Sequence, residues 1–540
     1  MVKKEVKQII ESGNVALGIE FGSTTIKLSL IADDFKTIGS GSYDWENNLE
    51  NGLWTYSIDD IWLGLQTAYQ KLNRQVFNHY GAEIATIKSL GVSAMMHGYL
   101  AFDKNDQLLV PFRTWRNATT GQASTDLTKL FGFNIPQRWS IAHLYQAILN
   151  QEAHVKNIDF LTTLAGYVHW QLTGKKVIGI GDASGMFPIE TATGSYNQNM
   201  MQQFSSLKSV QQYTWQIANI LPKPLKAGEI AGQLTEVGAK LLDPTGRLKA
   251  GAIVAPPEGD ASTGMVSTNS IKTKAGNISV GTSIFSMIVL EHNLKHVYNN
   301  IDIVNTPTGL PVAMVHANNS ASDLNAWTKL FDQFATMIGS HISTDELYKI
   351  LFNAALNDAE ADAGGLTGYG YYSGENITAM PEGRPLLVRQ PESAFTIGNL
   401  MRFHLFTAFG AIKIGMRILS DEAVLTDNIV AQGGVFKTPI VAQKLLAAAL
   451  NTDITVMKTA SEGGPWGMAI LSLYVTDKLP DQTLDEFLDD TVFAHEESET
   501  IAPETSDVEG FDTFMQRYIA GLDIELAAIK ALPSKKEGNH

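Results

Sequence analysis

The 540-residue chain contains no cysteine. This absence excludes disulfides, thiolate metal sites and cysteine nucleophiles together, and it fits a reducing compartment. No apolar run approaches the length of a membrane-spanning helix, and the first residues lack the continuous apolar core of a secretory signal. We therefore expect a cytoplasmic protein that has no membrane partner.

Positive charge is also scarce. With 40 Lys and Arg against 56 Asp and Glu, the formal net charge of the chain is −16. Such a chain would repel the phosphates of DNA or RNA, so we do not expect nucleic acid as a partner. The two common phosphate loops, Gly-x-Gly-x-x-Gly and Walker A, are missing as well. A phosphate ligand would have to be held by other turns.

The remaining composition is typical of a large globular protein, with 44% hydrophobic and 18% charged residues. A chain of this length exceeds what one hydrophobic core can hold, so we expect two large domains. The two halves also begin alike. Residues 15–31 (VALGIEFGSTTIKLSLI) predict a strand, a Gly-Ser-Thr turn and a second strand, and residues 277–290 (NISVGTSIFSMIVL) repeat this plan. The repeat is either a coincidence of common turn residues or a duplicated domain.

The pattern after the first hairpin predicts a strand over 37–45, a helix over 57–79 and a strand over 88–95. Such an order favours a mixed sheet over strict βα alternation. A tight turn with converging N–H groups and hydroxyls can hold phosphate, so one turn in each half could grip it from two walls of a cleft.

The second half predicts further alternating elements. We expect helices over 322–338, 398–419, 439–450 and 510–532, strands over 428–431 and 454–457, and a helix that opens within 462–467 (EGGPWG). The glycines that follow the strand at 428–431 would let a flat ligand approach the backbone closely, although each one taken alone reads as an ordinary turn.

Several short motifs occur in a fixed order along the chain. They are Glu20-Phe21-Gly22-Ser23-Thr24, Met96-His97-Gly98, Pro111 to Asn117 (PFRTWRN), Pro257-Glu258-Gly259-Asp260-Ala261, Gly281-Thr282-Ser283, Val430 to Val435, and Gly463-Gly464-Pro465-Trp466-Gly467. In this order they resemble the FGGY family of carbohydrate kinases, and within it the xylulokinase and ribulokinase branches. The resemblance extends from Val15 to about Leu473.

The resemblance implies an α/β fold of two ribonuclease-H-like, actin-like ATPase domains, related by duplication, with the ligand cleft between them. It places an N-terminal domain on the sugar and phosphate side at 1–265, a C-terminal domain on the ATP side at 266–490, and a helical appendage at 491–540. The cofactors that it implies are ATP and Mg²⁺.

Asp260 matches the catalytic base of the family. A sugar hydroxyl is a poor nucleophile, and a carboxylate within hydrogen-bond reach can take its proton during attack on the γ-phosphoryl group. Alternatively, Asp260 caps a helix that begins at Ala261, a role that Asp fills readily. Asp182 stands in a nearly identical local sequence (GDASG) and is a secondary candidate.

The resemblance also assigns the remaining site residues. Sugar contacts fall to Met96, His97, Trp115, Arg116 and Asp260; phosphate contacts to Gly22, Ser23, Thr24, Gly281, Thr282 and Ser283; adenosine contacts to Gly433, Gly434 and Gly464; and magnesium, through water, to Glu20 with Asp260. His97 could instead be a structural residue at a strand end. Glu20 departs from the usual Asp of the family; its extra methylene would shift the carboxylate while keeping the charge.

Together these features predict transfer of the ATP γ-phosphoryl group to a terminal hydroxyl of a ketopentose, D-xylulose first and ribulose second. Gluconate, glycerol or another polyol are alternative substrates of the family. A noncatalytic actin-like sugar and ATP sensor is the alternative from a different class, but the carboxylate at Asp260 speaks against it. The oligomeric state is left open, with a homodimer as one option.

Overall fold

The computed structural model describes residues 3–458 and 462–533, and its contacts divide the chain into two compact units. The first unit consists of Met1–Ile271, Asp302–Val312 and Glu462–Glu496, and the second of Lys272–Ile301, Ala313–Ser461 and Glu497–His540. The domains expected at 1–265, 266–490 and 491–540 follow chain order. Each compact unit instead combines segments that are far apart in the sequence.

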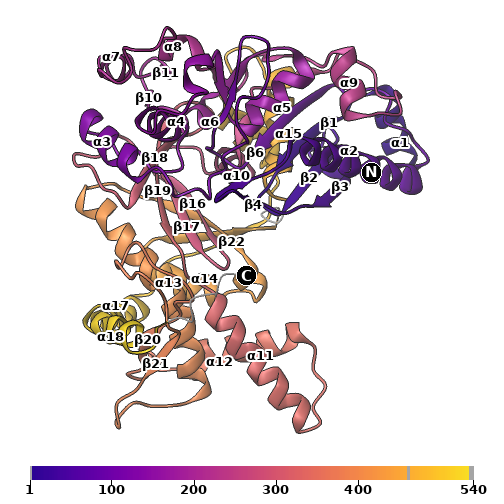
Figure 1. Cartoon of the computed structure of the whole chain (residues 1–540). Helices are drawn as coiled ribbons and strands as arrows, with labels where there is room; N and C mark the ends of the chain where they lie inside the picture. The colour runs from indigo at the N-terminus through magenta and orange to yellow at the C-terminus, as the bar shows by residue number, and fades with distance from the viewer. Residues whose placement is uncertain (1–2, 459–461, 534–540) are drawn as a thin grey trace. The chain divides into compact units, whose positions relative to one another are not determined.

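The first unit is built on a mixed sheet (Figure 1). Its strands lie in the order β13 (Gly232–Gln233), β14 (Ile253–Val254), β6 (Ser89–Ala94), β1 (Ala16–Phe21), β2 (Thr25–Ile31) and β3 (Thr37–Asp44), with β15 (Glu258–Gly259) also paired to β6. Strand β1 runs antiparallel to β2 and parallel to β6. The hairpin and the two further strands that the sequence predicts in this half are therefore confirmed.

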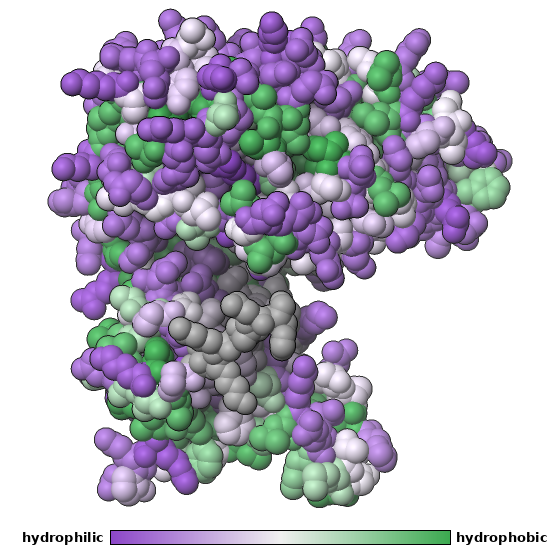
Figure 2. All heavy atoms as spheres, viewed as in Figure 1, coloured by the Kyte–Doolittle hydropathy of each residue, from purple (hydrophilic) through white to green (hydrophobic). Residues whose placement is uncertain are grey.

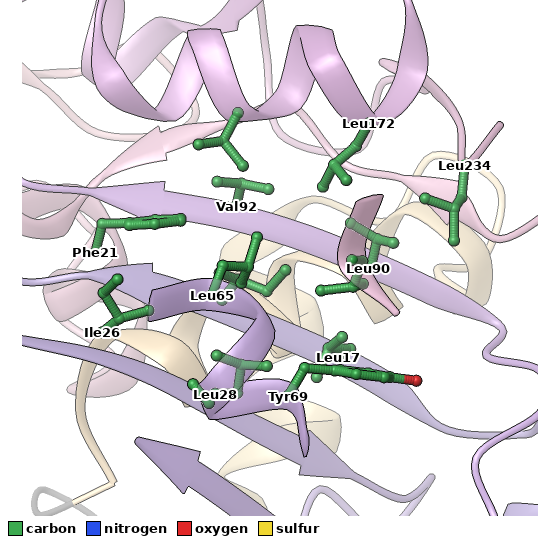
Figure 3. Close-up of a cluster of buried hydrophobic side chains, with 14 of the residues drawn as sticks. Leu17, Phe21, Ile26, Leu28, Leu65, Tyr69, Leu90, Val92, Leu172 and Leu234 are labelled. Atoms are coloured by element: carbon green, nitrogen blue, oxygen red, sulfur yellow. The ribbon is translucent and has the colours of Figure 1, made fainter. Parts of the chain in front are cut away.

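Alternation along β1 sends its side chains to opposite faces of this sheet. Leu17, Ile19 and Phe21 belong to the core that the sheet shares with α2 (Ile58–Tyr80) and α5 (Leu164–Thr173), and Figure 3 shows this cluster. The predicted helix over 57–79 is confirmed as α2, with the hydroxyl of Ser57 accepting from the Asp60 amide at 3.0 Å.

The other face of the sheet is covered by α15 (Gly463–Asp477), which also packs against α10 (Asp260–Ser267). The sequence predicted that a helix opens at 462–467, and this is confirmed. Gly18 of β1 faces α15 so closely that a Cβ there would overlap the carbonyl oxygen of Pro465. Strand β1 and helix α15 thus meet backbone to backbone, although more than 400 residues separate them in the sequence.

The second unit repeats the plan of the first. Its sheet holds, in order, β19 (Pro311–Ala317), β17 (Ile284–Val289), β16 (Ala275–Val280), β22 (Asn428–Gly433), β23 (Asp453–Met457) and β24 (Ser498–Ile501). Strand β16 runs antiparallel to β17 and parallel to β22, as β1 does to β2 and β6. The predicted α/β fold with a mixed sheet in each half is confirmed.

Most helices predicted for the second half are confirmed as α11 (Ser322–Met337), α13 (Ile397–Asp421) and α14 (Val441–Leu450), and α12 (Thr344–Asn357) accompanies them. The segment predicted to be helical over 510–532 is confirmed as helical, but it holds two helices rather than one. The structure has α17 (Thr505–Ala520) and α18 (Leu522–Ala531), which are separated at Gly521, a residue type that weakens helices. An acidic stretch with Glu496, Glu497 and Glu499 precedes them, and it contains part of β24, which pairs antiparallel with β23.

Helix α11 carries apolar side chains on its surface. Leu330, Phe334, Met337 and Ile338 are exposed, and Figure 2 shows apolar side chains among polar ones where α11 and α12 end. This spacing places them on one face of the helix. Within the described part of the chain, no helix combines the length and hydropathy needed to cross a bilayer.

The contact between β1 and α15 generates a stability prediction. We expect Gly18→Ala to destabilise the first unit by about 3 kcal/mol or more, the upper end of overpacking costs, because backbone atoms of α15 cannot move aside as a side chain could. The control is Gly121→Ala, since a Cβ at Gly121 would make only ordinary contacts near 3.9 Å. Urea unfolding of both variants checks this, and an unchanged midpoint for Gly18→Ala would contradict the packing described.

Candidate active site

Asp260 is the first residue of α10, directly after β15. Its Oδ1 accepts hydrogen bonds from the backbone amides of Met96 at 3.2 Å and Ala261 at 2.9 Å. Gly259, not Asp260, occupies the N-cap position, so the simple capping role considered for Asp260 does not describe its place in the helix. The carboxylate is oriented by two amides and remains exposed to solvent.

The surroundings of Asp260 favour a basic carboxylate. Although Asp260 as a residue is open to solvent, the protein around its carboxyl group desolvates it and raises its pKa above the usual value, while the hydrogen bonds from Met96 and Ala261 act in the opposite direction. A carboxylate with a raised pKa binds a proton more readily than an ordinary surface Asp. The group therefore has the access and the proton affinity that a general base requires.

Asp182 has a different environment. It lies in α6 (Ile180–Ala183), is only 1% exposed, and accepts a hydrogen bond from the Thr163 hydroxyl at 2.6 Å. Burial, together with the charge of Asp260, raises the pKa of Asp182 to about 7, although the hydrogen bond from Thr163 acts in the opposite direction. The equally buried Glu258 accepts from the Asp182 amide at 3.0 Å, and burial raises the pKa of Glu258 to about 8. Asp182 is enclosed by protein, whereas Asp260 reaches solvent.

Glu20 lies on the face of β1 that α15 covers. A Cβ at Gly464 would overlap Glu20 Oε1, so the glycine leaves the space that the longer Glu side chain occupies. Burial and the charge of Asp260 raise the pKa of Glu20 to about 7, although the charge of Lys27 acts in the opposite direction. Gly464, expected near adenosine, thus stands beside the carboxylate expected to serve magnesium.

Glu20 and Asp260 form an acidic pair rather than a complete metal cage. Within the described residues, no three His, Asp or Glu side chains gather closely enough to hold a metal ion. Mg²⁺ is commonly bound by one or two carboxylates together with waters and substrate phosphates. The pair therefore fits an ion that arrives with its phosphate ligand.

Met96, His97 and Gly98 form a turn after β6. His97 has a left-handed backbone with φ of 72° and is 5% exposed, and its Nδ1 lies 3.3 Å from the Gly185 carbonyl oxygen. Its ring stacks on Trp139 with centroids 6.2 Å apart. Burial holds the pKa of His97 well below its usual range, so the imidazole is neutral near pH 7. Strained backbone of this kind is concentrated at functional sites.

Trp115 and Arg116 lie in an exposed part of the loop over 111–117. Trp115 is 39% exposed, and the Arg116 guanidinium lies 3.8 Å from the ring centroid of Trp54. The loop is fixed by Asn117, whose side chain exchanges two 2.8 Å hydrogen bonds with the backbone of Trp54. Both side chains are therefore presented from an anchored loop.

The turn of Gly22, Ser23 and Thr24 is braced by two aromatic residues that the motifs did not indicate. Trp45 Nε1 donates to the Gly22 carbonyl at 2.8 Å, and the Tyr56 hydroxyl donates to the Ser23 carbonyl at 2.7 Å. The two rings stack with centroids 4.1 Å apart. With the carbonyl oxygens engaged, the exposed hydroxyls of Ser23 and Thr24 remain available to a ligand.

The corresponding turn of the second unit is built in the same way. The carbonyl oxygens of Gly281 and Thr282 accept from the amides of Ala321 at 3.0 Å and Ser320 at 2.9 Å. The side chain of Thr282 is exposed, and Ser283 is partly exposed. Each unit by itself thus presents a turn with engaged carbonyls and accessible hydroxyls, as an anion site requires.

Gly433 is the last residue of β22 in the second unit, and Gly434 begins the short 3-10 helix that follows. Beyond them lies a hollow of about 340 Å³, whose lining includes Thr438, Gln443 and Met457. Strands β22 and β23 are parallel, and the hollow lies at their carboxyl ends, where α/β sheets commonly bind ligands. The two glycines and the hollow are close together, whereas Gly464 belongs to the first unit.

The sequence motifs missed two features near Asp260: the segment Asp302–Val312 and the side chain of Arg138. The segment Asp302–Val312 belongs to the first unit, and there the Asn305 amide donates to the Ser184 hydroxyl at 3.0 Å while the Ser262 hydroxyl donates to the Asn305 carbonyl at 3.3 Å. Arg138 pairs with Asp302 of the same segment. Only the folded chain reveals this segment, because it carries no motif of its own.

Comparison with known proteins finds relatives along the whole chain. A xylulose kinase of Haemophilus influenzae is 22% identical over 527 residues, covering 94% of this chain and 99% of the relative. Among solved structures, the xylulose kinase from Rhodospirillum rubrum has a TM-score of 0.73 at 17% identity, covering 96% of this chain and 99% of that one. The gluconate kinase from Lactobacillus acidophilus has a TM-score of 0.74 at 16% identity, covering 95% and 98%. At these identities the solved structures establish the fold alone.

Family models decide the classification. The N-terminal domain of the FGGY family of carbohydrate kinases matches residues 15–266, and the C-terminal domain of the same family matches residues 276–475. The two matches cover most of the chain and include every motif quoted above. The chain therefore belongs to the FGGY family of carbohydrate kinases, and it is a sugar kinase that takes a sugar and ATP as substrates.

Proposed function

We propose that the protein transfers the γ-phosphoryl group of ATP to a terminal hydroxyl of a ketopentose, D-xylulose in the first place and ribulose in the second. The observation that carries the proposal is the exposed carboxylate of Asp260, which is hydrogen-bonded to the amide of Met96, next to His97. The carboxylate of Asp260 and the neutral imidazole of His97 are thus connected through the turn that begins at Met96. The relatives named as xylulose kinases support this choice of sugar.

Asp260 is the general base of the proposed reaction. Its Oδ1 is held by two amides, which leaves Oδ2 to accept the proton of the attacking hydroxyl. As that proton moves to Asp260, the hydroxyl oxygen bonds to the γ-phosphorus, and the bond from the γ-phosphorus to the oxygen of the ADP leaving group breaks. His97, Met96, Trp115 and Arg116 are the proposed sugar contacts.

The turns at 22–24 and 281–283 are the proposed phosphate contacts, and Gly433, Gly434 and the hollow beyond them the proposed adenosine site. Glu20 and Asp260 would hold the Mg²⁺ that accompanies ATP. Gly464 leaves space beside Glu20, and its expected contact with adenosine stays a prediction. When bound, Mg²⁺ neutralises charge on the phosphate oxygens. The cytoplasmic location and the homodimer stay predictions.

An ADP-release assay over pentuloses, polyols and aldonates tests the proposal. We expect kcat/KM to be highest for D-xylulose, with ribulose next, because the enzyme that carries out this reaction must favour the transition state of its own substrate. A higher kcat/KM for glycerol, another polyol or gluconate would contradict the proposed sugar while leaving the kinase family membership untouched.

The role of Asp260 is tested by Asp260→Asn, which keeps an oxygen able to accept from the Met96 and Ala261 amides. We expect kcat to fall by roughly a hundredfold to ten-thousandfold, the range for a positioned general base, with ATP affinity and melting temperature nearly unchanged. The matched control is Asp182→Asn, which should retain much more of the turnover because Asp182 is enclosed. A severe loss in the control with near-normal turnover in Asp260→Asn would show that the base is Asp182.

The role of Glu20 is tested with three variants. We expect Glu20→Asp to keep activity, because it retains a carboxylate, and Glu20→Ala and Glu20→Gln to lose roughly a hundredfold in kcat/KM at limiting Mg²⁺. The Gln variant is the control for size, since it fills the same space beside Gly464 without charge. Initial rates across a Mg²⁺ titration provide the measurement, and equal rates in the wild type and Glu20→Ala would remove Glu20 from the site.

A further inference from the structure

Arg138 and Asp302 form a charge pair inside the first unit. Arg138 Nη2 pairs with Asp302 Oδ2, and Asn134 Nδ2 donates to Asp302 Oδ1 at 3.0 Å. Asp302 is 8% exposed, so its charge is largely removed from water and needs a partner. Arg138 supplies that partner while part of its side chain stays exposed.

The backbone of Arg138 is joined to the turn that carries His97. The Gly98 amide donates to the Arg138 carbonyl at 3.2 Å, and the Ser140 hydroxyl donates to the Gly98 carbonyl at 2.6 Å. Between them in the sequence, Trp139 stacks on the His97 ring. Contacts of the successive residues Arg138, Trp139 and Ser140 therefore hold Arg138 beside the turn that carries His97, a proposed sugar contact.

The guanidinium keeps donors to spare. Within the part of the chain that the structure describes, Nη2 is the one guanidinium nitrogen of Arg138 with a hydrogen-bonded partner. An Arg side chain offers five N–H donors in a planar fork, so those that Asp302 does not use can reach oxygen atoms of a ligand. The charge of Arg138 also lowers the pKa of both His97 and Asp260, which places it within electrostatic reach of the proposed sugar contact and the proposed base.

We infer that Arg138, neutralised by Asp302, is a specificity-determining residue that makes the site select neutral open-chain sugars over sugar acids. The inference rests on the proposed function, because it concerns the sugar side of the same site.

The physical reason is the balance of charge. An unpaired guanidinium binds a carboxylate through two parallel hydrogen bonds, and it would draw an aldonate into the site. With Asp302 engaged, the pair has no net charge, and the remaining N–H groups of Arg138 donate to hydroxyl or carbonyl oxygens without a net positive charge that attracts an acid. The carboxylate of Asp260 then repels an acidic substrate. A neutral ketopentose meets no such repulsion.

The test is Asp302→Asn in the full chain, with D-xylulose and its carboxylate analogue D-xylonate as ligands in titration calorimetry. Asn keeps a side-chain oxygen for Asn134 or Arg138 but no charge. We expect the affinity for xylonate relative to xylulose to rise by about tenfold or more, because one uncompensated cation then faces the ligand. The matched control is Asp106→Asn, which breaks the exposed pair with Lys176 in the same unit and should leave the ratio unchanged.

The double variant Arg138→Gln with Asp302→Asn separates this role from general damage. This variant has no unpaired charge at positions 138 and 302, so we expect it to lose the gain in xylonate affinity. We also expect it to bind xylulose about tenfold more weakly than the wild type, because it lacks a charged donor. An unchanged ratio in Asp302→Asn, or a gain that persists in the double variant, overturns the inference. If Asp302→Asn does not fold, unchanged xylulose affinity in the double variant overturns it.

Binding is measured without turnover, so the two proposals fail separately. A wild-type chain that binds xylulose but releases no ADP contradicts the proposed function alone. A wild-type chain that binds xylonate at least as well as xylulose contradicts the selectivity inferred here, even if xylulose is phosphorylated.

Discussion

The close contact between β1 and α15 is the constraint on which the first unit depends. Gly18 allows the backbone of α15 to approach the strand, and Gly464 leaves room for the Glu20 carboxylate next to it. Strand β1 thus allows α15 to approach at Gly18, which has no side chain, and places a carboxylate at Glu20, the next residue on the same face. Without that close approach, α15 could not pack on β1 and bring residues 462–496 into a unit made mostly of the first 271 residues.

Several carboxyl groups of the first unit lie in surroundings from which water is largely excluded, where the charged form of a carboxyl is costly. Glu20, Asp182 and Glu258 all have pKa values raised by burial, and the charges of Asp182 and Asp260 raise the pKa of their neighbours further. Groups with pKa values shifted in this manner are concentrated at functional sites. Exposure distinguishes them, because Asp182 and Glu258 are buried whereas Asp260 is exposed.

The two candidate phosphate turns reveal a shared way of preparing an anion site. In the first unit the carbonyl oxygens of Gly22 and Ser23 are taken by the side chains of Trp45 and Tyr56. In the second unit those of Gly281 and Thr282 are taken by backbone amides. Both solutions turn acceptors away from the ligand and leave hydroxyls exposed, although they use different chemical groups. The two turns therefore share engaged carbonyl oxygens and accessible hydroxyls, although their individual contacts differ.

Sequence alone determined the elements and the order of the motifs. Apolar alternation predicted β1, β2 and β6, helical periodicity predicted α2, and glycine-containing motifs placed Asp260 and the two turns, because these signals are local. It was incomplete near the end of the chain. One helix was expected over 510–532, where the chain forms two that Gly521 separates, and the stretch with Glu496, Glu497 and Glu499 before it contains part of a strand that only its pairing with β23 reveals.

Tertiary structure alone decided which residues meet. Asp182 and Asp260 have nearly the same neighbours in the sequence, yet one is 1% exposed and the other faces solvent. Gly464 was assigned to adenosine by its motif, which stays a prediction, and only the fold places it beside Glu20. Arg138 and Asp302 carry no motif and are 164 residues apart. Burial, close backbone approach and charge pairing arise from the packing of distant segments, which no local pattern specifies.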